Sequence, residues 1–257
     1  VLISDWAAIE ETIYHGYCAD KEDAAIRAVE AGVDIDMMTG IYCDNLCRLV
    51  REGKIPESLV DECCMRILEL KNKLGLFENP YKDADEEKEQ QLILCKEHRE
   101  LAREAARKSF VLLKNEEQIL PLDKTKKTAF IGPYVNSRNL MGSWSIIGEA
   151  KDITTVEEIM AVEEAGNNVV CCQGSPMLGA EVILEGFTEE NQATYTPEEE
   201  AKMLEEALEA AKKADQVVLF IGEDRLQSGE ATSNATIQIP QIQQNLLERV
   251  AEIKENI

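Results

Sequence analysis

The sequence predicts an α/β fold in two domains, with parallel strands that are buried on both faces. Short apolar runs that stop at a glycine or an acid are typical of such strands. Between the runs lie segments whose apolar residues recur every three or four positions, the pattern of an amphipathic helix. A nearly wholly charged stretch at 82–90 separates two such series. We therefore expect one α/β series on each side of it.

The first apolar run, at 1–4, ends at the carboxylate of Asp5, which the indole of Trp6 follows. Barrel enzymes and open α/β sheets place their chemistry at the carboxyl ends of parallel strands. Asp5 is therefore a candidate catalytic group, and Trp6 could stack on a ring-shaped ligand. On this stretch alone a structural interpretation has about even odds, in which Asp5 caps the next helix and Trp6 fills a core.

Strands and helices alternate before residue 81. Gly32 ends the first helix, and Gly75 stands where a C′ glycine is expected after the last one. The last helix has apolar residues in steps of three and four, at Val60, Cys63, Ile67, Leu70 and Leu74. In order, we expect a strand at 1–4, a polar loop through 14–17, a helix at about 21–31, a strand at 32–38, a helical stretch at 45–50 and a helix from 57 to 74.

The charged stretch has no apolar side chain to bury, which indicates a solvated linker or helix face. We place a domain boundary there. The expected ranges are 1–80 for the first domain, 81–90 for the linker and 91–257 for the second domain.

The second domain resumes the alternation. Its clearest buried strand, at 216–221, ends at Gly222 and the acid Glu223, and the loop that follows carries Glu230. An earlier glycine-hinged loop presents Trp144. In order, we expect a helix around 94–105, a buried run at 110–113, a strand at 129–133, a helix at 155–164, a strand at 168–171, a loop at 187–196, a helix from 197, the strand at 216–221 and a helix at 242–253.

Composition excludes some classes of function. The 257 residues carry 27 Lys and Arg against 50 Asp and Glu, a formal net charge of −23, so nucleic acid is an unfavourable partner. No run approaches the roughly 18 apolar residues of a membrane span, so no membrane partner is expected. No glycine-rich nucleotide motif follows any strand.

The eight cysteines include no CxxC pair, and we expect small buried side chains with reduced thiols in a cytoplasmic protein. Cys43 and Cys47 stand one helical turn apart, but His15 and His98 are the only histidines, so a four-ligand zinc site is not expected. The cysteines are Cys18, Cys43, Cys47, Cys63, Cys64, Cys95, Cys171 and Cys172.

Asp5 and Glu230 are two acids at strand ends in different parts of the chain, each with a tryptophan in its region. Hydrolysis of a glycosidic bond uses such a pair: one carboxylate attacks or activates water, and the other protonates the leaving oxygen. The spacing alone is a weak signal, because 50 acidic residues offer many pairs.

An ordered series of motifs resembles glycoside hydrolase family 3, the β-glucosidase group, over nearly the whole chain. Its order is more specific than any single motif. The motifs are Ser4-Asp5-Trp6, His15-Gly16-Tyr17, Ala31 to Met37, Arg66-Ile67-Leu68, Leu74 to Pro80, Ala102 to Arg107, Val111 to Asn115, Leu120-Pro121-Leu122, Ile131-Gly132-Pro133, Gly142-Ser143-Trp144 and Ser228 to Ala231.

The resemblance implies a (β/α)₈ barrel followed by an α/β sandwich, with the sugar bound between them. Asp5 matches the nucleophile that forms a glycosyl-enzyme, and Glu230 matches the usual place of the acid/base. Glu223 is the second choice for the acid/base, although its position directly after the strand suits a structural role. Trp6 and Trp144 match aromatic positions that line the sugar cleft. Relatives commonly have Ser-Arg where this chain has Ser233 and Asn234.

The resemblance covers only the last two βα units of the barrel and part of the sandwich, so both domains are expected to be incomplete. A closed barrel needs roughly 250 residues. We expect a fragment of a retaining exo-acting β-glycosidase that is inactive alone, uses no metal or cofactor, and takes an oligosaccharide or an aryl or alkyl β-glycoside. The alternative is a non-catalytic α/β module that binds a small molecule or a protein. The oligomeric state is left open.

Overall fold

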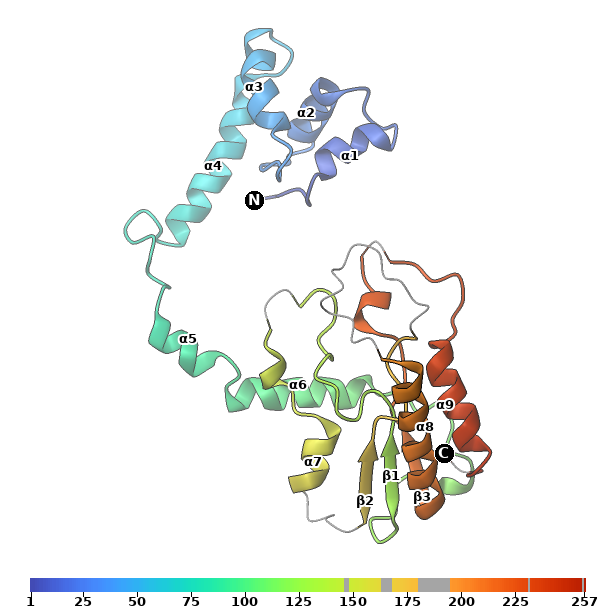
Figure 1. Cartoon of the computed structure of the whole chain (residues 1–257). Coiled ribbons are helices and arrows are strands. Elements are labelled where there is room, and N and C mark those ends of the chain that lie inside the picture. Colours follow the sequence, from blue (N-terminus) through green and yellow to red (C-terminus); the bar gives the residue numbers. More distant parts are fainter. Residues whose placement is uncertain (146–147, 163–167, 180–194, 231, 256) are drawn as a thin grey trace. The chain divides into compact units, whose positions relative to one another are not determined.

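A computed structural model describes residues 1–145, 148–162, 168–179, 195–230, 232–255 and 257. The chain divides into two compact units, Val1–Phe110 and Val111–Ile257 (Figure 1). Helices and parallel strand pairing occur in both units, which confirms the α/β class. Each unit is described by itself below.

The two expected strands of the first unit meet only through one isolated parallel bridge, between Ile3 and Ile35. Hydrogen bonds from Ser4 N–H to Ile35 O (3.0 Å) and from Asp34 N–H to Leu2 O (2.8 Å) flank it. The expected burial of the first run is wrong: the residues Val1, Leu2 and Ile3 are 54%, 55% and 54% exposed. A strand with a single neighbour is not enclosed as it would be inside a wider sheet.

Four helices build the core of the first unit. They are α1 (Ala8–Tyr14), α2 (Lys21–Glu30), α3 (Ile41–Arg51) and α4 (Glu57–Lys73). The carboxylate of Asp20 accepts from Asp23 N–H (2.9 Å) and caps α2, and Gly32 follows with φ +85°. Helix α1 lies where only a polar loop was expected, because buried Ile9 packs against the other helices. The core side chains are Ile9, Cys18, Ala24, Ala25, Val29, Ile41, Leu49, Ile55 and Cys63.

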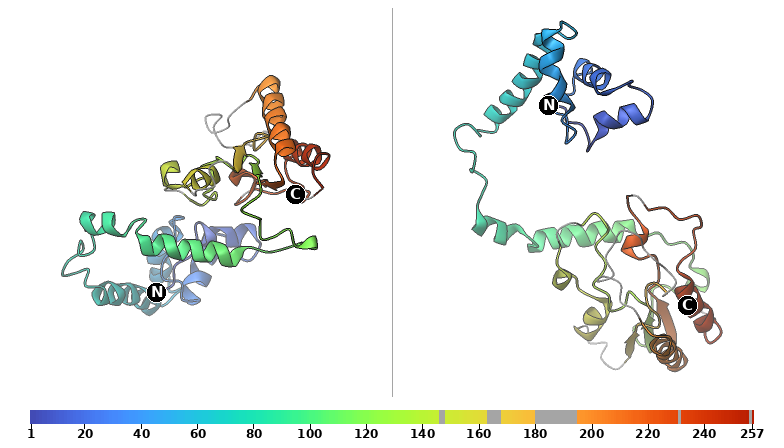
Figure 2. Two further views of the ribbon diagram at one scale, coloured as in Figure 1. Left: turned by 90° about the horizontal axis from the view of Figure 1, so that it is seen from below. Right: turned by 45° about the horizontal axis from the view of Figure 1, so that its top comes forward.

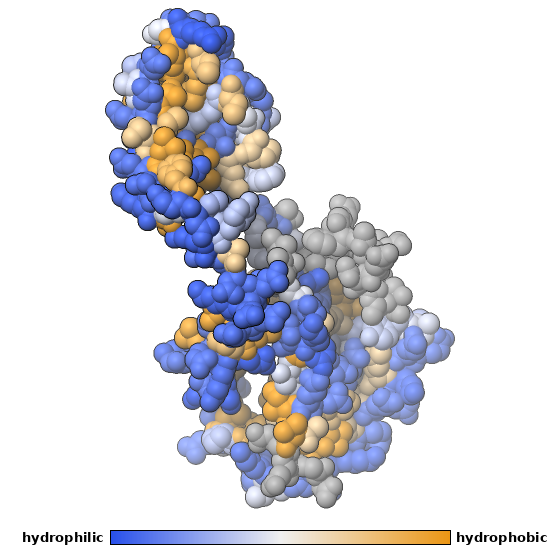
Figure 3. Space-filling view, turned by 90° about the vertical axis from the view of Figure 1, so that its left-hand side faces the viewer, coloured by the Kyte–Doolittle hydropathy of each residue, from blue (hydrophilic) through white to orange (hydrophobic). Residues whose placement is uncertain are grey.

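Helix α4 leaves much of its expected apolar stripe in solvent. Cys63 is its only buried residue, and Leu70 and Leu74 are 43% and 45% exposed. Figure 3 shows apolar side chains at the surface of this unit. The sequence pattern predicted the helix correctly. It did not indicate how much of the apolar face of the helix is covered by other elements.

The helices α5 (Glu86–Leu92) and α6 (Lys96–Ser109) have no buried residue, so neither packs into a core. The expected domain ranges around this stretch stay a prediction. The run at 110–113 was expected to be buried, and this is wrong: its four residues are 66–91% exposed. It joins no strand and therefore has no sheet to cover it.

The second unit is organised on a three-stranded parallel sheet of order β2-β1-β3, with β1 at Thr128–Ile131, β2 at Val169–Cys172 and β3 at Gln216–Leu219. Thr128 pairs with Val169 on one side and with Gln216 on the other. Every residue of the central strand β1 is buried, as expected for a strand flanked on both edges.

Three helices accompany this sheet in the part of the second unit that the structure describes: α7 (Val156–Val162), α8 (Pro197–Lys213) and α9 (Gln241–Ala251) (Figure 2). Thr196 and Glu199 form a capping box at the start of α8, with Pro197 at its first position. The core formed by the sheet, α8 and α9 consists of Ala129, Ile131, Ala207, Ala211, Ala214, Val217, Leu246 and Val250.

Parts of two expected elements lie outside the described residues: most of the loop at 187–196 and the end of the helix at 155–164. Short 3₁₀ turns occur at Glu116–Gln118, Ala150–Asp152 and Arg225–Gln227. Among the described residues, none of the helices combines the length and apolar character needed to cross a bilayer.

Candidate active site

Asp5 stands directly after the bridged strand of the first unit and is exposed. Its Oδ1 accepts a hydrogen bond from Trp6 N–H (2.7 Å), and its carbonyl accepts one from Ser4 Oγ (3.0 Å). The capping interpretation is wrong, because Ala7 is the N-cap of α1 and no side chain caps that helix. Trp6 is 61% exposed, so it does not fill a core either. Both side chains are therefore accessible.

The main chain around Asp5 is fixed by the end of the neighbouring strand. Ala7 N–H donates to Met37 O (3.2 Å), and Met37 N–H donates to Ser4 Oγ (2.9 Å). Ala7 and Met38 both adopt left-handed backbone, with φ of 56° and 79°. Such conformations are unfavourable for non-glycine residues and persist only where the surroundings impose them, often at functional sites. The turn that aims Asp5 is thus held from two sides.

An ion pair between the buried carboxylate of Asp34 and the partly exposed Arg66 supports the strand that carries Asp5. Asp34 accepts from Leu2 N–H (2.8 Å) and from Arg66 Nε (2.7 Å), with its side chain 1% exposed. Burial by itself would raise the pKa of Asp34, but the hydrogen bonds from Leu2 and Arg66 outweigh it and hold that pKa below its usual value. The carboxylate is therefore charged and ties the first strand to α4.

Glu230 lies in the loop between β3 and α9, at the carboxyl edge of the sheet, and is exposed. Fully buried Gln243 holds the beginning of this loop: its Oε1 accepts from Gly222 N–H (2.8 Å), and its Nε2 donates to Gly222 O (2.9 Å) and Met177 O (2.6 Å). The carboxylate of Glu230 has no hydrogen bond or ion pair with any other residue that the structure describes. It remains open to solvent.

Glu223, the second choice for the acid/base, has interactions within the loop. Its Oε1 accepts from Asn234 Nδ2 (2.8 Å), and its carbonyl accepts from the hydroxyl of Tyr134. Burial, followed by the nearby charges of Asp224 and Glu223, raises the pKa of Tyr134 to about 12, so the hydroxyl stays a donor. Asn234 therefore serves here to hold Glu223. The geometry favours a structural role for Glu223.

The loop that carries Trp144 meets the loop that carries Glu230. Trp144 is 69% exposed, and the preceding Ser143 lies against Gly229 so closely that a Cβ on the glycine would overlap its Oγ. Gly229 has φ +127°, a region open to glycine alone. The two loops leave neighbouring parallel strands at the same edge of the sheet, which explains why they meet (Figure 1).

The four candidate residues thus fall into two pairs. Asp5 and Trp6 are in the first unit, and Glu230 and Trp144 are in the second. Sequence reasoning missed the supporting residues Asp34 and Gln243. Each acts through a contact with a residue far away in the chain, which no local pattern encodes.

Among the residues that the structure describes, no three His, Cys, Asp or Glu side chains cluster so as to hold a metal ion. All eight cysteines are free, but the expectation that they are buried holds for only some of them: Cys43, Cys47 and Cys64 are exposed. Cys43 and Cys47 lie on the face of α3 opposite to buried Leu49, so helix periodicity places them in solvent.

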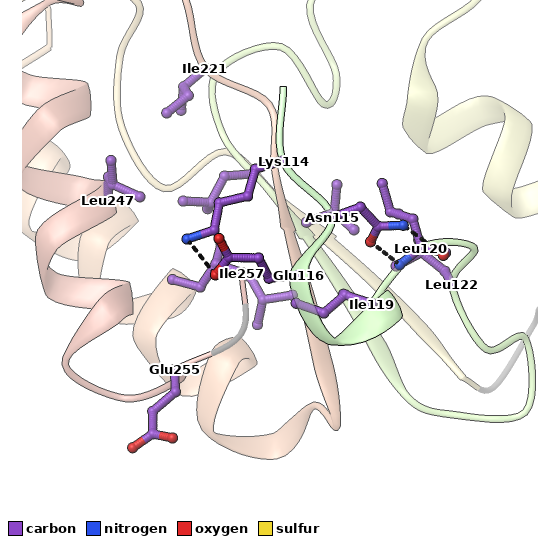
Figure 4. A pocket seen from close by; sticks show the side chains of 13 residues that line it. Lys114, Asn115, Glu116, Ile119, Leu120, Leu122, Ile221, Leu247, Glu255 and Ile257 are labelled. Carbon is purple, nitrogen blue, oxygen red and sulfur yellow. Dashed lines mark hydrogen bonds and ion pairs between the residues drawn. The ribbon is translucent and has the colours of Figure 1, made fainter. Parts of the chain in front are cut away.

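A cavity of about 520 Å³ lies beside β3 (Figure 4). Its wall is mainly apolar, and several of its polar groups pair with one another: Lys114 pairs with Glu116 (3.2 Å), and Asn115 exchanges two hydrogen bonds with Leu120. None of the four candidate residues lines it. The lining residues are Lys114, Asn115, Glu116, Ile119, Leu120, Leu122, Val217, Val218, Leu219, Ile221, Leu247, Glu255 and Ile257.

Comparison with known proteins confirms the family resemblance. Residues 1–70 match the N-terminal domain of glycosyl hydrolase family 3, and residues 110–257 match the C-terminal domain of the same family. A periplasmic β-glucosidase of Salmonella typhimurium is 36% identical over 96% of this chain and 33% of its own length. A putative β-xylosidase of Formosa agariphila is 31% identical over 97% of this chain and 31% of its own.

Solved structures agree. The β-glucosidase of Listeria innocua in complex with isofagomine superposes with a TM-score of 0.81 at 37% identity, over 98% of this chain and 32% of that one. The chain spans about a third of the length of the curated relatives it matches. The similarity to a periplasmic protein contradicts the expected cytoplasmic setting, which rested on the cysteines. Unpaired thiols that act as small apolar side chains do not require a reducing compartment.

Proposed function

Since the chain belongs to glycosyl hydrolase family 3, we propose that it supplies the catalytic carboxylates of a retaining exo-acting β-glycosidase. Asp5 is the nucleophile and Glu230 is the acid/base. The observation that carries the proposal is the setting of Asp5: an accessible carboxylate at the end of a parallel strand, on a backbone turn held from two sides.

The proposed roles are those of the two carboxylates in a retaining glycosidase. Asp5 attacks the anomeric carbon and forms a glycosyl ester while the bond to the leaving oxygen breaks. Glu230 gives its proton to that oxygen, and then takes a proton from the water that cleaves the ester. The absence of a hydrogen-bond partner for Glu230 among the described residues leaves its carboxyl group available to substrate and water. Trp6 and Trp144 offer exposed indole faces on which sugar rings stack.

The substrate class is inferred from the relatives. Their names include β-glucosidase and β-xylosidase, and the Listeria innocua enzyme has been solved with glucose and, as a mutant, with laminaribiose. We infer that this protein removes a terminal β-linked glucosyl or xylosyl unit from an oligosaccharide or from an aryl or alkyl glycoside.

Mechanism-based labelling tests the proposal. The complete gene product that contains this chain is treated with a 2-deoxy-2-fluoro-glucoside carrying a good leaving group, and its peptides are mapped. An adduct on the peptide with Asp5 is the expected result. Hydrolysis of a glucoside without label on Asp5 would refute the nucleophile assignment. If the protein neither hydrolyses nor labels, a non-catalytic binding module becomes the better explanation.

The 257-residue chain on its own is expected to give little or no turnover. Its first unit offers a single parallel bridge and not a closed barrel, so few walls surround Asp5. This expectation would be contradicted if the isolated chain hydrolysed a glucoside at a rate similar to that of the complete gene product.

A further inference from the structure

The loop with Trp144 and the loop with Glu230 are joined by more than the contact at Gly229. Asn139 Nδ2 donates to Asp224 Oδ2 at 3.0 Å. The two residues stand near the beginnings of their loops, whereas Ser143 and Gly229 meet further along. The loops are thus joined at two successive contacts. Trp144 directly follows Ser143, and Glu230 directly follows Gly229, the two residues of the second contact.

Both partners of this hydrogen bond are anchored. Asp224 is buried, its N–H donates to Gln227 Oε1 (3.0 Å), and its carbonyl accepts from Gln227 N–H (2.9 Å), so it is fixed to the 3₁₀ turn that begins the Glu230 loop. Beside Asn139, the guanidinium of Arg138 contacts the carboxylate of Glu158 and the carbonyl of Ile153, which ties the start of the Trp144 loop to its end. A hydrogen bond between two anchored residues can fix the position of one loop relative to the other.

We propose that Asn139 and Asp224 are positioning residues that set the place of Glu230 relative to Trp144. This inference rests on the proposed role of Glu230. The buried Asp224 carboxylate accepts a charge-assisted hydrogen bond from the Asn139 amide, and this bond fixes the spacing of the two loops. Gly229 then lets them close to direct contact. The proposed acid/base and the aromatic side chain of Trp144 are thereby held at a fixed spacing.

Exchange of the two groups provides the test. Asn139→Asp removes the amide donor and places a second carboxylate beside the buried one of Asp224, so the two groups repel and the loops separate. The double variant Asn139→Asp/Asp224→Asn restores one amide and one carboxylate with the direction of donation reversed. Asn72→Asp makes the same chemical change at an exposed position of α4 and serves as the matched control.

The readout is the dependence on the leaving group, measured in the complete gene product. An alkyl β-glucoside needs protonation of its leaving oxygen, whereas a 2,4-dinitrophenyl β-glucoside does not. We expect Asn139→Asp to lower kcat/KM about 10- to 100-fold for the alkyl substrate and only a few-fold for the dinitrophenyl one, because a displaced acid loses its effect. The double variant should recover most of this loss, and Asn72→Asp should match the unmodified protein.

Two results would overturn the inference. One is an Asn139→Asp variant as active as the unmodified protein on both substrates. The other is an equal loss on both substrates that the double variant does not recover, since that would mean general loss of the fold. Failure of the proposed function looks different. If Glu230 is not the acid/base, Glu230→Gln will leave hydrolysis of the alkyl glucoside unchanged, and if the protein is not a glycosidase, the unmodified protein will hydrolyse neither glucoside.

Discussion

The two candidate carboxylates are held in place by different kinds of hydrogen bond. Asp5 follows a strand directly, and main-chain groups of residues on both sides of it are bonded to the neighbouring strand end. Glu230 lies within a long loop beyond β3, and side chains hold that loop: Gln243 at its beginning and Asn139 shortly after. The proposed nucleophile is thus supported mainly by main-chain hydrogen bonds, and the proposed acid/base is supported by side chains.

The difference predicts how each site responds to change. Main-chain hydrogen bonds survive most substitutions, so the place of Asp5 should depend on few side chains, chiefly those of Ser4 and Asp34. The place of Glu230 depends on specific side chains and should be easier to disturb. A nucleophile must approach one carbon atom opposite the leaving group, which demands a fixed position. An acid/base exchanges protons first with the leaving oxygen and then with a water, so it works from a less rigidly held position.

The largest effect should follow loss of Asp5. Asp5→Gly removes the nucleophile and should reduce kcat for an aryl glucoside by roughly 10⁵-fold, the scale seen when a covalent catalyst is deleted. Added azide can enter the space left by the side chain and attack from the same face. The product is then a glycosyl azide of inverted anomeric configuration, which NMR identifies.

Asp83→Gly is the matched control, since Asp83 is an exposed acid with its side chain 84% exposed. It should leave kcat unchanged. Substantial turnover by Asp5→Gly without azide, with retained configuration, would assign the nucleophile to another residue.

A smaller effect, confined to certain substrates, should follow loss of the acid/base. Glu230→Gln should lower kcat/KM for an alkyl glucoside about 10²- to 10⁴-fold, the range of general acid catalysis. A dinitrophenyl glucoside should be affected much less in its glycosylation step. Steady-state and pre-steady-state rates with both substrates measure these effects.

Glu223→Gln separates the two choices for the acid/base. An amide at 223 keeps an oxygen that can accept from Asn234, so this variant should retain nearly full activity on both substrates. If Glu223→Gln instead shows the dependence on the leaving group and Glu230→Gln does not, the assignment must be exchanged.

The local signals in the sequence located most elements correctly. The helix α8 was expected from Pro197 and a stripe of alanines and leucines, and it begins at that proline with a capping box. The glycine after α4 adopts the left-handed backbone expected of a C′ residue. Strand β1 was expected from its short apolar run and is wholly buried. Capping, backbone freedom and periodicity are properties of a few adjacent residues.

Burial was predicted less well, because it depends on what covers a segment. The apolar runs at 1–3 and 110–113 resemble β1 in composition, yet they are exposed. Helix α1 was missed because its stabilisation comes from packing of Ile9 and not from a strong periodic stripe. For the site, motifs singled out Asp5 and Glu230, whereas the contact between Asn139 and Asp224 joins distant segments and leaves no local trace.

The smallest effect on turnover, visible mainly in stability, should come from the ion pair behind Asp5. Asp34→Asn keeps the shape of the side chain but loses the charge that Leu2 N–H and Arg66 bind. We expect the first unit to be destabilised by about 1–3 kcal/mol at pH 7, the cost of weakening charge-assisted hydrogen bonds at a buried group. Urea unfolding, followed by the fluorescence of Trp6 in a Trp144→Phe background, reports this unit alone.

The pH dependence of stability shows whether Asp34 stabilises the first unit through its charge. Because the pKa of Asp34 is lowered in the folded protein, the stability it contributes is complete above the ordinary aspartate value of about 4 and is lost as pH falls through and below it. The gap between the unmodified protein and Asp34→Asn should therefore be constant from pH 7 to 5 and close towards pH 3. Asp61→Asn, on exposed α4 surface, should show no gap at any pH. A gap that persists unchanged at pH 3 would mean that Asp34→Asn acts through the different hydrogen bonds of the amide and not through the lost charge, and the support of the Asp5 strand would then not depend on a buried charge.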